Sequence, residues 1–144
     1  MPHFKLLAVL AITATQAFAE TGSRKLIVSL ADHKLALVED GHVVKVFPIA
    51  VGKSSTPSPT GSFQIISRTV KPTWYHAGQV VPPGPANPVG TRWIGLSQKG
   101  YGIHGTNAPR SIGKSASHGC IRMRNRDILA LARMMPVGTP VVIR

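Results

Sequence analysis

The stretch KLIVSLADHKLALVEDGHVVKVFPIA, residues 25–50, decides the fold class. It contains three short runs rich in Val, Ile and Leu, which predict β-strands at 25–30, 35–39 and 42–50. Asp32-His33 predicts a turn between the first two strands. Asp40-Gly41 is a strong hairpin signal between the second and the third. Pro48 lacks a backbone N–H, so it predicts that the third strand lies at a sheet edge or contains a bulge.

Further strands are predicted along the rest of the chain, at 63–67, 92–96, 102–104 and 141–143. Between them, residues 71–91 carry five prolines and three glycines, which predicts no regular element there. A long loop inside a small domain is typical of a lid or a substrate wall, and Trp74 and Tyr75 would cover a cleft from it.

One helix is predicted close to the C-terminus. Asn125 is expected to be its N-cap, and Ile128, Leu131 and Met135 share one face. Pro136 ends it. The prediction is therefore a mainly β domain, a sandwich or partly closed barrel, with one short helix.

Residues 1–19 have the pattern of a secretory signal peptide. Lys5 supplies a positive charge, residues 6–12 are apolar, and Ala17-Phe18-Ala19 is an Ala-x-Ala cleavage signal. The apolar run is too short to span a bilayer, and no other stretch approaches that length, so we expect no stable membrane insertion. We expect an exported protein of the periplasm or cell wall, whose domain covers 20–144.

The chain is strongly basic, with a formal net charge of +12, and removal of Lys5 with the leader lowers this by one. A charge of this size suggests a polyanionic partner, although solubility alone also accounts for it. Export makes nucleic acid an unexpected partner. It favours wall polymers, carboxylate-bearing wall peptides or membrane surfaces.

Cys120 is the only cysteine, so the chain has no intramolecular disulfide. It follows Ser117, His118 and Gly119, and a second His-Gly pair, His104-Gly105, lies upstream. A neighbouring imidazole makes thiolate available, so the pattern favours a nucleophilic sulfur, which backbone N–H groups and a nearby helix N-terminus would support.

Two alternatives to a nucleophilic cysteine stay open at this point. In the first alternative, Cys120 is a small buried hydrophobic residue without a chemical role. In the other, His104, His118 and Cys120 are three ligands of a metal site, although no second cysteine or acidic residue lies nearby to complete it.

The motif formed by His104-Gly105-Thr106 and by residues 117–122, SHGCIR, resembles the active-site motif of the L,D-transpeptidase (YkuD-like) family. The similarity covers essentially the whole mature chain, with further landmarks at 59–63 and 87–93. Many members carry Asn where this chain has Arg122. Members that join wall peptides or anchor a lipoprotein to the wall resemble the Arg version.

The resemblance implies a β-rich fold and a peptidoglycan stem peptide as substrate. By this resemblance, Cys120 is the nucleophile and His104 the general base, oriented by the backbone carbonyl of Gly105. Backbone donors from His118, Gly119 and Cys120 would hold the oxyanion. Substrate-binding residues are expected to be Arg122, Ser117, Tyr75 and Trp93.

The implied reaction releases D-alanine and leaves a thioester, without metal or cofactor. An amine from a neighbouring stem or an envelope protein then resolves the thioester, whereas water would give L,D-carboxypeptidase activity. Two rivals from other classes are a non-catalytic wall-binding module and a papain-type endopeptidase. In the papain family the cysteine precedes the histidine, and here His104 precedes Cys120.

Overall fold

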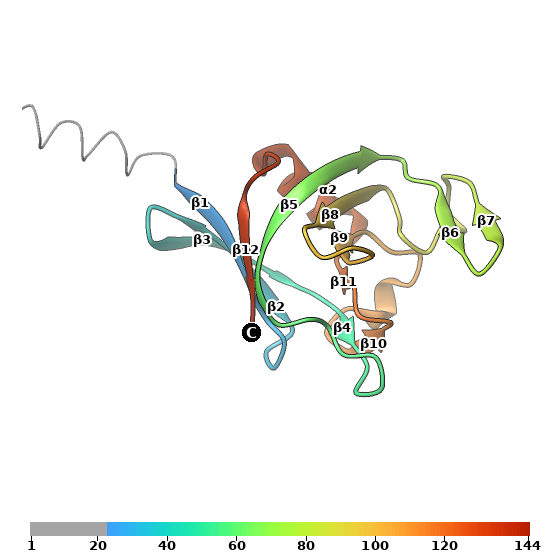
Figure 1. Ribbon diagram of the computed structural model, residues 1–144, viewed down its shortest axis with the longest axis horizontal. Coiled ribbons are helices and arrows are strands. Elements are labelled where there is room, and N and C mark those ends of the chain that lie inside the picture. Colours follow the sequence, from blue (N-terminus) through green and yellow to red (C-terminus); the bar gives the residue numbers. More distant parts are fainter. Residues whose placement is uncertain (1–22) are drawn as a thin grey trace, which may run out of the picture.

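Strands dominate the computed structural model, which describes residues 23–144 (Figure 1). The strands are β1 (Arg24–Ser29), β2 (Lys34–Glu39), β3 (His42–Pro48), β4 (Val51–Gly52), β5 (Gly61–Val70), β6 (Trp74–His76), β7 (Gln79–Val81), β8 (Arg92–Leu96), β9 (Gly102–His104), β10 (Ser115–Ser117), β11 (Ile121–Arg122) and β12 (Pro140–Ile143). The helical elements are the 3-10 turn η1 (Pro109–Ser111) and the α-helix α2 (Asn125–Met134). The prediction of a mainly β fold is confirmed.

The main sheet has eight strands in the order β11-β9-β8-β5-β12-β1-β2-β3. Its long central strand β5 pairs with β12 through residues 61–64 and with β8 through residues 65–70. The register shifts between Ile65 and Ser67, at the point where the partner changes. Such an irregularity bends a strand, and Figure 1 shows β5 arching across the molecule, so that the sheet curls into a half-barrel.

The first three strands form as the sequence predicts. Asp40 and Gly41 have φ of +50° and +81°, which are the left-handed conformations that a two-residue hairpin turn requires. β3 lies at the end of the sheet order, so the edge position predicted from Pro48 is also confirmed.

The core lies inside the curled sheet. Alternate residues of β1 and β2, such as Leu26, Val28 and Leu35, are fully buried there. α2 packs against β8 and β9 and contributes Ile128 and Leu131, which are also fully buried. The helix thus supports, from behind, the strands that carry the first histidine motif.

The prediction of no regular element at 71–91 is wrong. β6 and β7 pair there as a hairpin, which projects from the end of β5 in Figure 1. Ala77 and Gly78 turn it with φ of +48° and +80°. The buried amide of Asn87 orders the proline-rich return, because it donates to the carbonyl oxygens of Pro72, Val81 and Pro82.

The expected N-cap of the helix is also wrong. Arg124 occupies the N-cap position without a side-chain cap, and Asn125 is the first helical residue. The Asn125 amide bonds to Thr91 and Thr106 instead, because the loop after β9 passes over this end of the helix.

The expected signal peptide, residues 1–19, lies outside the described residues. Within 23–144, no helix is both long enough and apolar enough to cross a membrane.

Candidate active site

Parallel pairing of β9 with β11 brings the two histidine motifs together. The register sets Ile103 opposite Ile121 and His104 opposite Arg122. The amide of Met123 also donates to the carbonyl oxygen of His104 at 2.8 Å. His104 therefore ends β9 beside Arg122, the last residue of β11, and Cys120 immediately precedes the first residue of β11.

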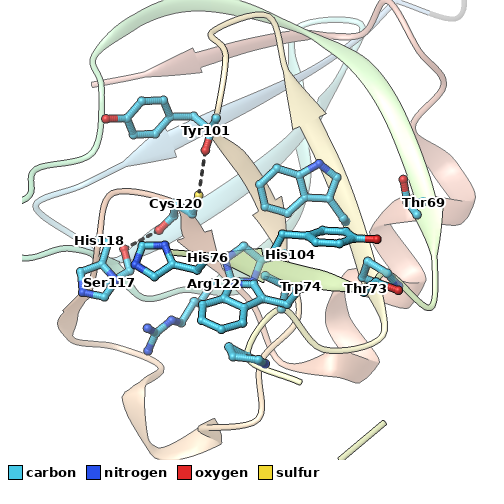
Figure 2. A pocket seen from close by; sticks show the side chains of 16 residues that line it. Thr69, Thr73, Trp74, His76, Tyr101, His104, Ser117, His118, Cys120 and Arg122 are labelled. Carbon is cyan, nitrogen blue, oxygen red and sulfur yellow. Dashed lines mark hydrogen bonds between the residues drawn. The ribbon is translucent and has the colours of Figure 1, made fainter. Parts of the chain in front are cut away.

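Both motifs open on a cavity of about 760 Å³ (Figure 2). All the side chains expected at the site line it: Cys120, His104, His118, Ser117, Arg122, Tyr75 and Trp93. Gly105 and Gly119 are not among the lining residues. The β6–β7 hairpin supplies one wall through Trp74, Tyr75 and His76. The expectation that this proline-rich segment covers a cleft therefore agrees with its position.

His104 is only 5% exposed and has a defined orientation. Its Nδ1 lies 2.5 Å from the carbonyl oxygen of Gly105. Because a carbonyl only accepts, Nδ1 carries the proton and Nε2 is left as the basic nitrogen. Trp93 is the cross-strand neighbour of His104, and the two rings stack with their centroids 5.6 Å apart.

The turn before Cys120 is held by Ser117, whose side chain is buried. The Ser117 hydroxyl donates to the Cys120 carbonyl at 2.6 Å and accepts from the Gly119 amide at 3.0 Å. Gly119 has φ of +126°, and a Cβ there would lie 2.7 Å from the Tyr101 ring. Glycine is therefore required at 119, and the Ser117 hydroxyl is occupied inside the turn.

The profile of the L,D-transpeptidase catalytic domain family matches residues 23–143. The chain belongs to this family. A putative L,D-transpeptidase of Bacillus licheniformis (YkuD) is 47% identical over 119 residues, which are 83% of this chain and 64% of that protein. The chain thus spans less than two thirds of that relative.

Solved L,D-transpeptidases share the fold. A mutant of the Enterococcus faecium enzyme is 25% identical, with a TM-score of 0.71 over 86% of this chain and 50% of the other. An L,D-transpeptidase of Mycobacterium smegmatis, 19% identical, has a TM-score of 0.72 over 85% of this chain and 58% of the other. The second likeness bears on the fold alone.

Burial sets the protonation states in this L,D-transpeptidase domain. Desolvation lowers the pKa of His104 from 6.5 to about 4, against an opposing contribution from its bond to Gly105. The charge of Arg122 lowers it further. At neutral pH the imidazole is therefore unprotonated, as a proton acceptor must be.

Desolvation also raises the pKa of Cys120, although the Gly102 amide and Arg122 favour the thiolate. The thiol donates a hydrogen bond to the carbonyl oxygen of Gly100, which lies 3.7 Å from Sγ and is joined to it by a dashed line in Figure 2. The raised pKa favours the thiol over the thiolate at rest. Along the chain, β11 separates Cys120 from the first residue of α2, and burial outweighs the effect of the Arg122 charge on the Cys120 pKa.

Two residues of this L,D-transpeptidase site escaped the sequence reasoning. Tyr101 lines the cavity and contacts Gly119. His76 lies between Trp74 and His118, parallel to the His118 ring, with their centroids 6.3 Å apart. Ala77-Gly78 between two β-prone runs was the available signal for the hairpin that carries His76.

In the part of the chain that the structure describes, no three His, Cys, Asp or Glu side chains lie close enough to hold a metal ion. The alternative set of His104, His118 and Cys120 thus shares a cavity without forming a ligand cluster.

Proposed function

We propose that the protein is an exported L,D-transpeptidase that acts on peptidoglycan stem peptides. The observation that carries the proposal is the shared cavity of Cys120 and His104, with the His104 tautomer set by Gly105. A thiol and an oriented, unprotonated imidazole that share one cavity are the two groups that acyl transfer through a thioester requires.

The first half-reaction forms the thioester. His104 Nε2 takes the Cys120 proton as Sγ attacks the carbonyl carbon that joins the L-centre of the third residue to D-alanine. Because both groups are neutral at rest, proton transfer accompanies the attack. The C–N bond then breaks, and the D-alanine amine leaves with the proton from His104.

The second half-reaction returns the thiol. An acceptor amine attacks the thioester and gives its proton to His104. A new amide bond forms, the C–S bond breaks, and Cys120 regains its proton. The acceptor is the amine of a neighbouring stem or of an envelope protein, and no step needs a metal or cofactor.

Backbone amides hold the oxyanion in both half-reactions. The Gly119 N–H already donates to Ser117, so it is not available for this task. The proposal therefore assigns the oxyanion to the amides of His118 and Cys120. Ser117 acts by shaping the turn that presents them.

The charge of the site suits a substrate rich in carboxylates. Between residues 41 and 126 the chain has no Asp or Glu and eleven Lys or Arg. Arg122 lines the cavity, and its guanidinium donates to Ser111 Oγ at 3.2 Å. We assign Arg122 to a substrate carboxylate, and Tyr75 and Trp93 to the walls that contact the peptide.

We infer export from the signal-peptide pattern of residues 1–19, so the proposed enzyme acts in the periplasm or cell wall. Neither nucleic acid nor stable membrane insertion has a part in this function.

Incubation of the protein with disaccharide-tetrapeptides and mass analysis of the products test the proposal. We expect free D-alanine and a cross-linked dimer, and neither with Cys120→Ala. A tripeptide without dimer would identify an L,D-carboxypeptidase. Binding without any product, and no acyl adduct on Cys120, would leave a wall-binding module.

A further inference from the structure

The side chain of Asn125 joins three segments of the backbone around His104. Its Oδ1 accepts from the Thr91 amide at 3.3 Å and from the Thr106 amide at 3.1 Å. Its Nδ2 donates to the Thr106 carbonyl at 3.0 Å. The first turn of α2 is thereby tied to the loop after β9 and to the start of β8.

The bond to Thr106 fixes the carbonyl on which His104 depends. The Thr106 N–H and the Gly105 C=O belong to one peptide unit, which is planar and trans, so the two groups point in opposite directions. Asn125 Oδ1 binds the N–H end of this unit, and His104 Nδ1 donates to the C=O end. Rotation of the unit breaks both contacts together.

Other backbone bonds hold the residues on the N-terminal side of this unit. The Met123 amide donates to the His104 carbonyl, and the Gly105 amide donates to the Arg92 carbonyl at 3.2 Å. Neither bond involves the unit between Gly105 and Thr106. Among the side-chain bonds of the described residues, the one from Asn125 holds its N–H.

The local sequence is built for the close approach of this amide. A Cβ at Gly105 would lie 2.1 Å from Asn125 Oδ1, and a Cβ at Gly90 would lie 2.2 Å from it. Both glycines therefore leave the space that the Asn125 side chain fills.

We propose that Asn125 is a positioning residue for the base, holding the Gly105–Thr106 peptide so that the Gly105 carbonyl keeps the proton of His104 on Nδ1. Without this restraint the imidazole also takes the tautomer with its proton on Nε2, the nitrogen that must accept from Cys120. Asn125 is not among the residues that line the catalytic cavity, so the effect falls on turnover rather than on substrate binding. The inference rests on the proposed role of His104.

The test compares Asn125→Ala and Asn125→Asp with Asn107→Ala. Aspartate keeps the oxygen that accepts from Thr106 and loses the amide donor. Asn107 lies in the same loop, but its amide donates to the Ala86 carbonyl at 3.2 Å, so it is the matched control. D-alanine release gives kcat and KM, and ring ¹⁵N chemical shifts report which nitrogen of His104 carries the proton.

We expect Asn125→Ala to lower kcat by about 10- to 100-fold, taking as the scale the loss of an outer hydrogen-bond partner that orients a metal-ligating histidine, with KM within about threefold. Its ¹⁵N spectrum should show both tautomers. Asn125→Asp should recover part of kcat and show mainly the Nδ1–H form, and Asn107→Ala should match wild type in both measurements.

Wild-type kcat in folded Asn125→Ala, or a single Nδ1–H tautomer in it, overturns the inference. So does Asn125→Asp that is no faster than Asn125→Ala. If Asn125→Ala does not fold, the ¹⁵N spectrum of His104 in Asn125→Asp decides. Loss of the Nδ1–H form in that variant would count against the proposal. If His104→Asn keeps the wild-type kcat, His104 is not the base, and the proposed function fails at that point. The ¹⁵N spectra of the Asn125 variants would still test whether Asn125 sets the His104 tautomer.

Discussion

Acid should destabilise this protein through His104, and the effect can be isolated with one substitution. His104 is buried, and its pKa falls from 6.5 to about 4 on folding. The unfolded chain therefore binds a proton at this residue more tightly than the folded protein does. The stability that the neutral imidazole provides is complete above pH 6.5 and is lost as the pH falls towards 4.

The size of the effect follows from the two pKa values. Each tenfold change in proton affinity is worth about 1.4 kcal/mol, so the fall from 6.5 to about 4 corresponds to about 3 kcal/mol. This is a large share of the roughly 5–15 kcal/mol by which a domain is stable. Wild type should thus lose about 3 kcal/mol between pH 7 and pH 4 beyond what a non-titrating variant loses.

His104→Asn is the variant to compare, because its amide nitrogen lies close to the position of Nδ1 and can still donate to Gly105. Urea unfolding at pH 7, 6, 5 and 4, followed by circular dichroism, gives the free energies. Tryptophan fluorescence is unsuitable because Trp93 stacks on His104. His42→Asn, the same change at an exposed histidine of β3, should keep the wild-type slope.

Equal pH slopes for wild type and His104→Asn would refute the reasoning, since they would mean that the histidine has the same proton affinity in the folded and unfolded chains. A loss of stability in His104→Asn that is constant across pH would not refute the reasoning, because the variant also loses the stacking on Trp93.

Three further predictions concern the chemistry of the site and its backbone. Cys120→Ala should leave the melting temperature close to wild type and abolish the acyl-enzyme mass shift that wild type shows with a tetrapeptide donor. Arg122→Ala should lower kcat/KM by roughly 10- to 150-fold, Arg122→Lys by less, and an amidated stem should abolish most of the difference; full additivity of variant and amidation would contradict the carboxylate contact. Gly105→Ala should lower the free energy of unfolding more than Gly113→Ala does, because a Cβ at 105 would lie 2.1 Å from Asn125 Oδ1. A Cβ at 113 meets open space, and only the backbone strain at φ of +90° is left there, worth about 1 kcal/mol. Urea titration measures both losses, and equal losses would contradict this reasoning.

The sequence by itself determined the elements whose cause is local. Alternation of apolar residues and the Asp40-Gly41 turn specify β1 to β3, because side-chain direction and turn geometry depend on neighbours along the chain. The buried face of α2 follows from spacing in the same way. The chemical identity of the motif around Cys120 was equally visible, since it rests on residue types and their order.

Tertiary structure alone decided how these parts act together. The pairing of β9 with β11 joins residues far apart in sequence, and no local pattern encodes that register. The neutral states of the His104 imidazole and the Cys120 thiol arise from desolvation, which depends on what packs over them. Asparagine is a residue type that favours helix N-caps, yet the Asn125 side chain bonds to the backbone of Thr106. The loop after β9 offers it better-placed partners than its own helix does. Propensity describes a residue with its neighbours in sequence, whereas these properties depend on neighbours that only folding brings into contact.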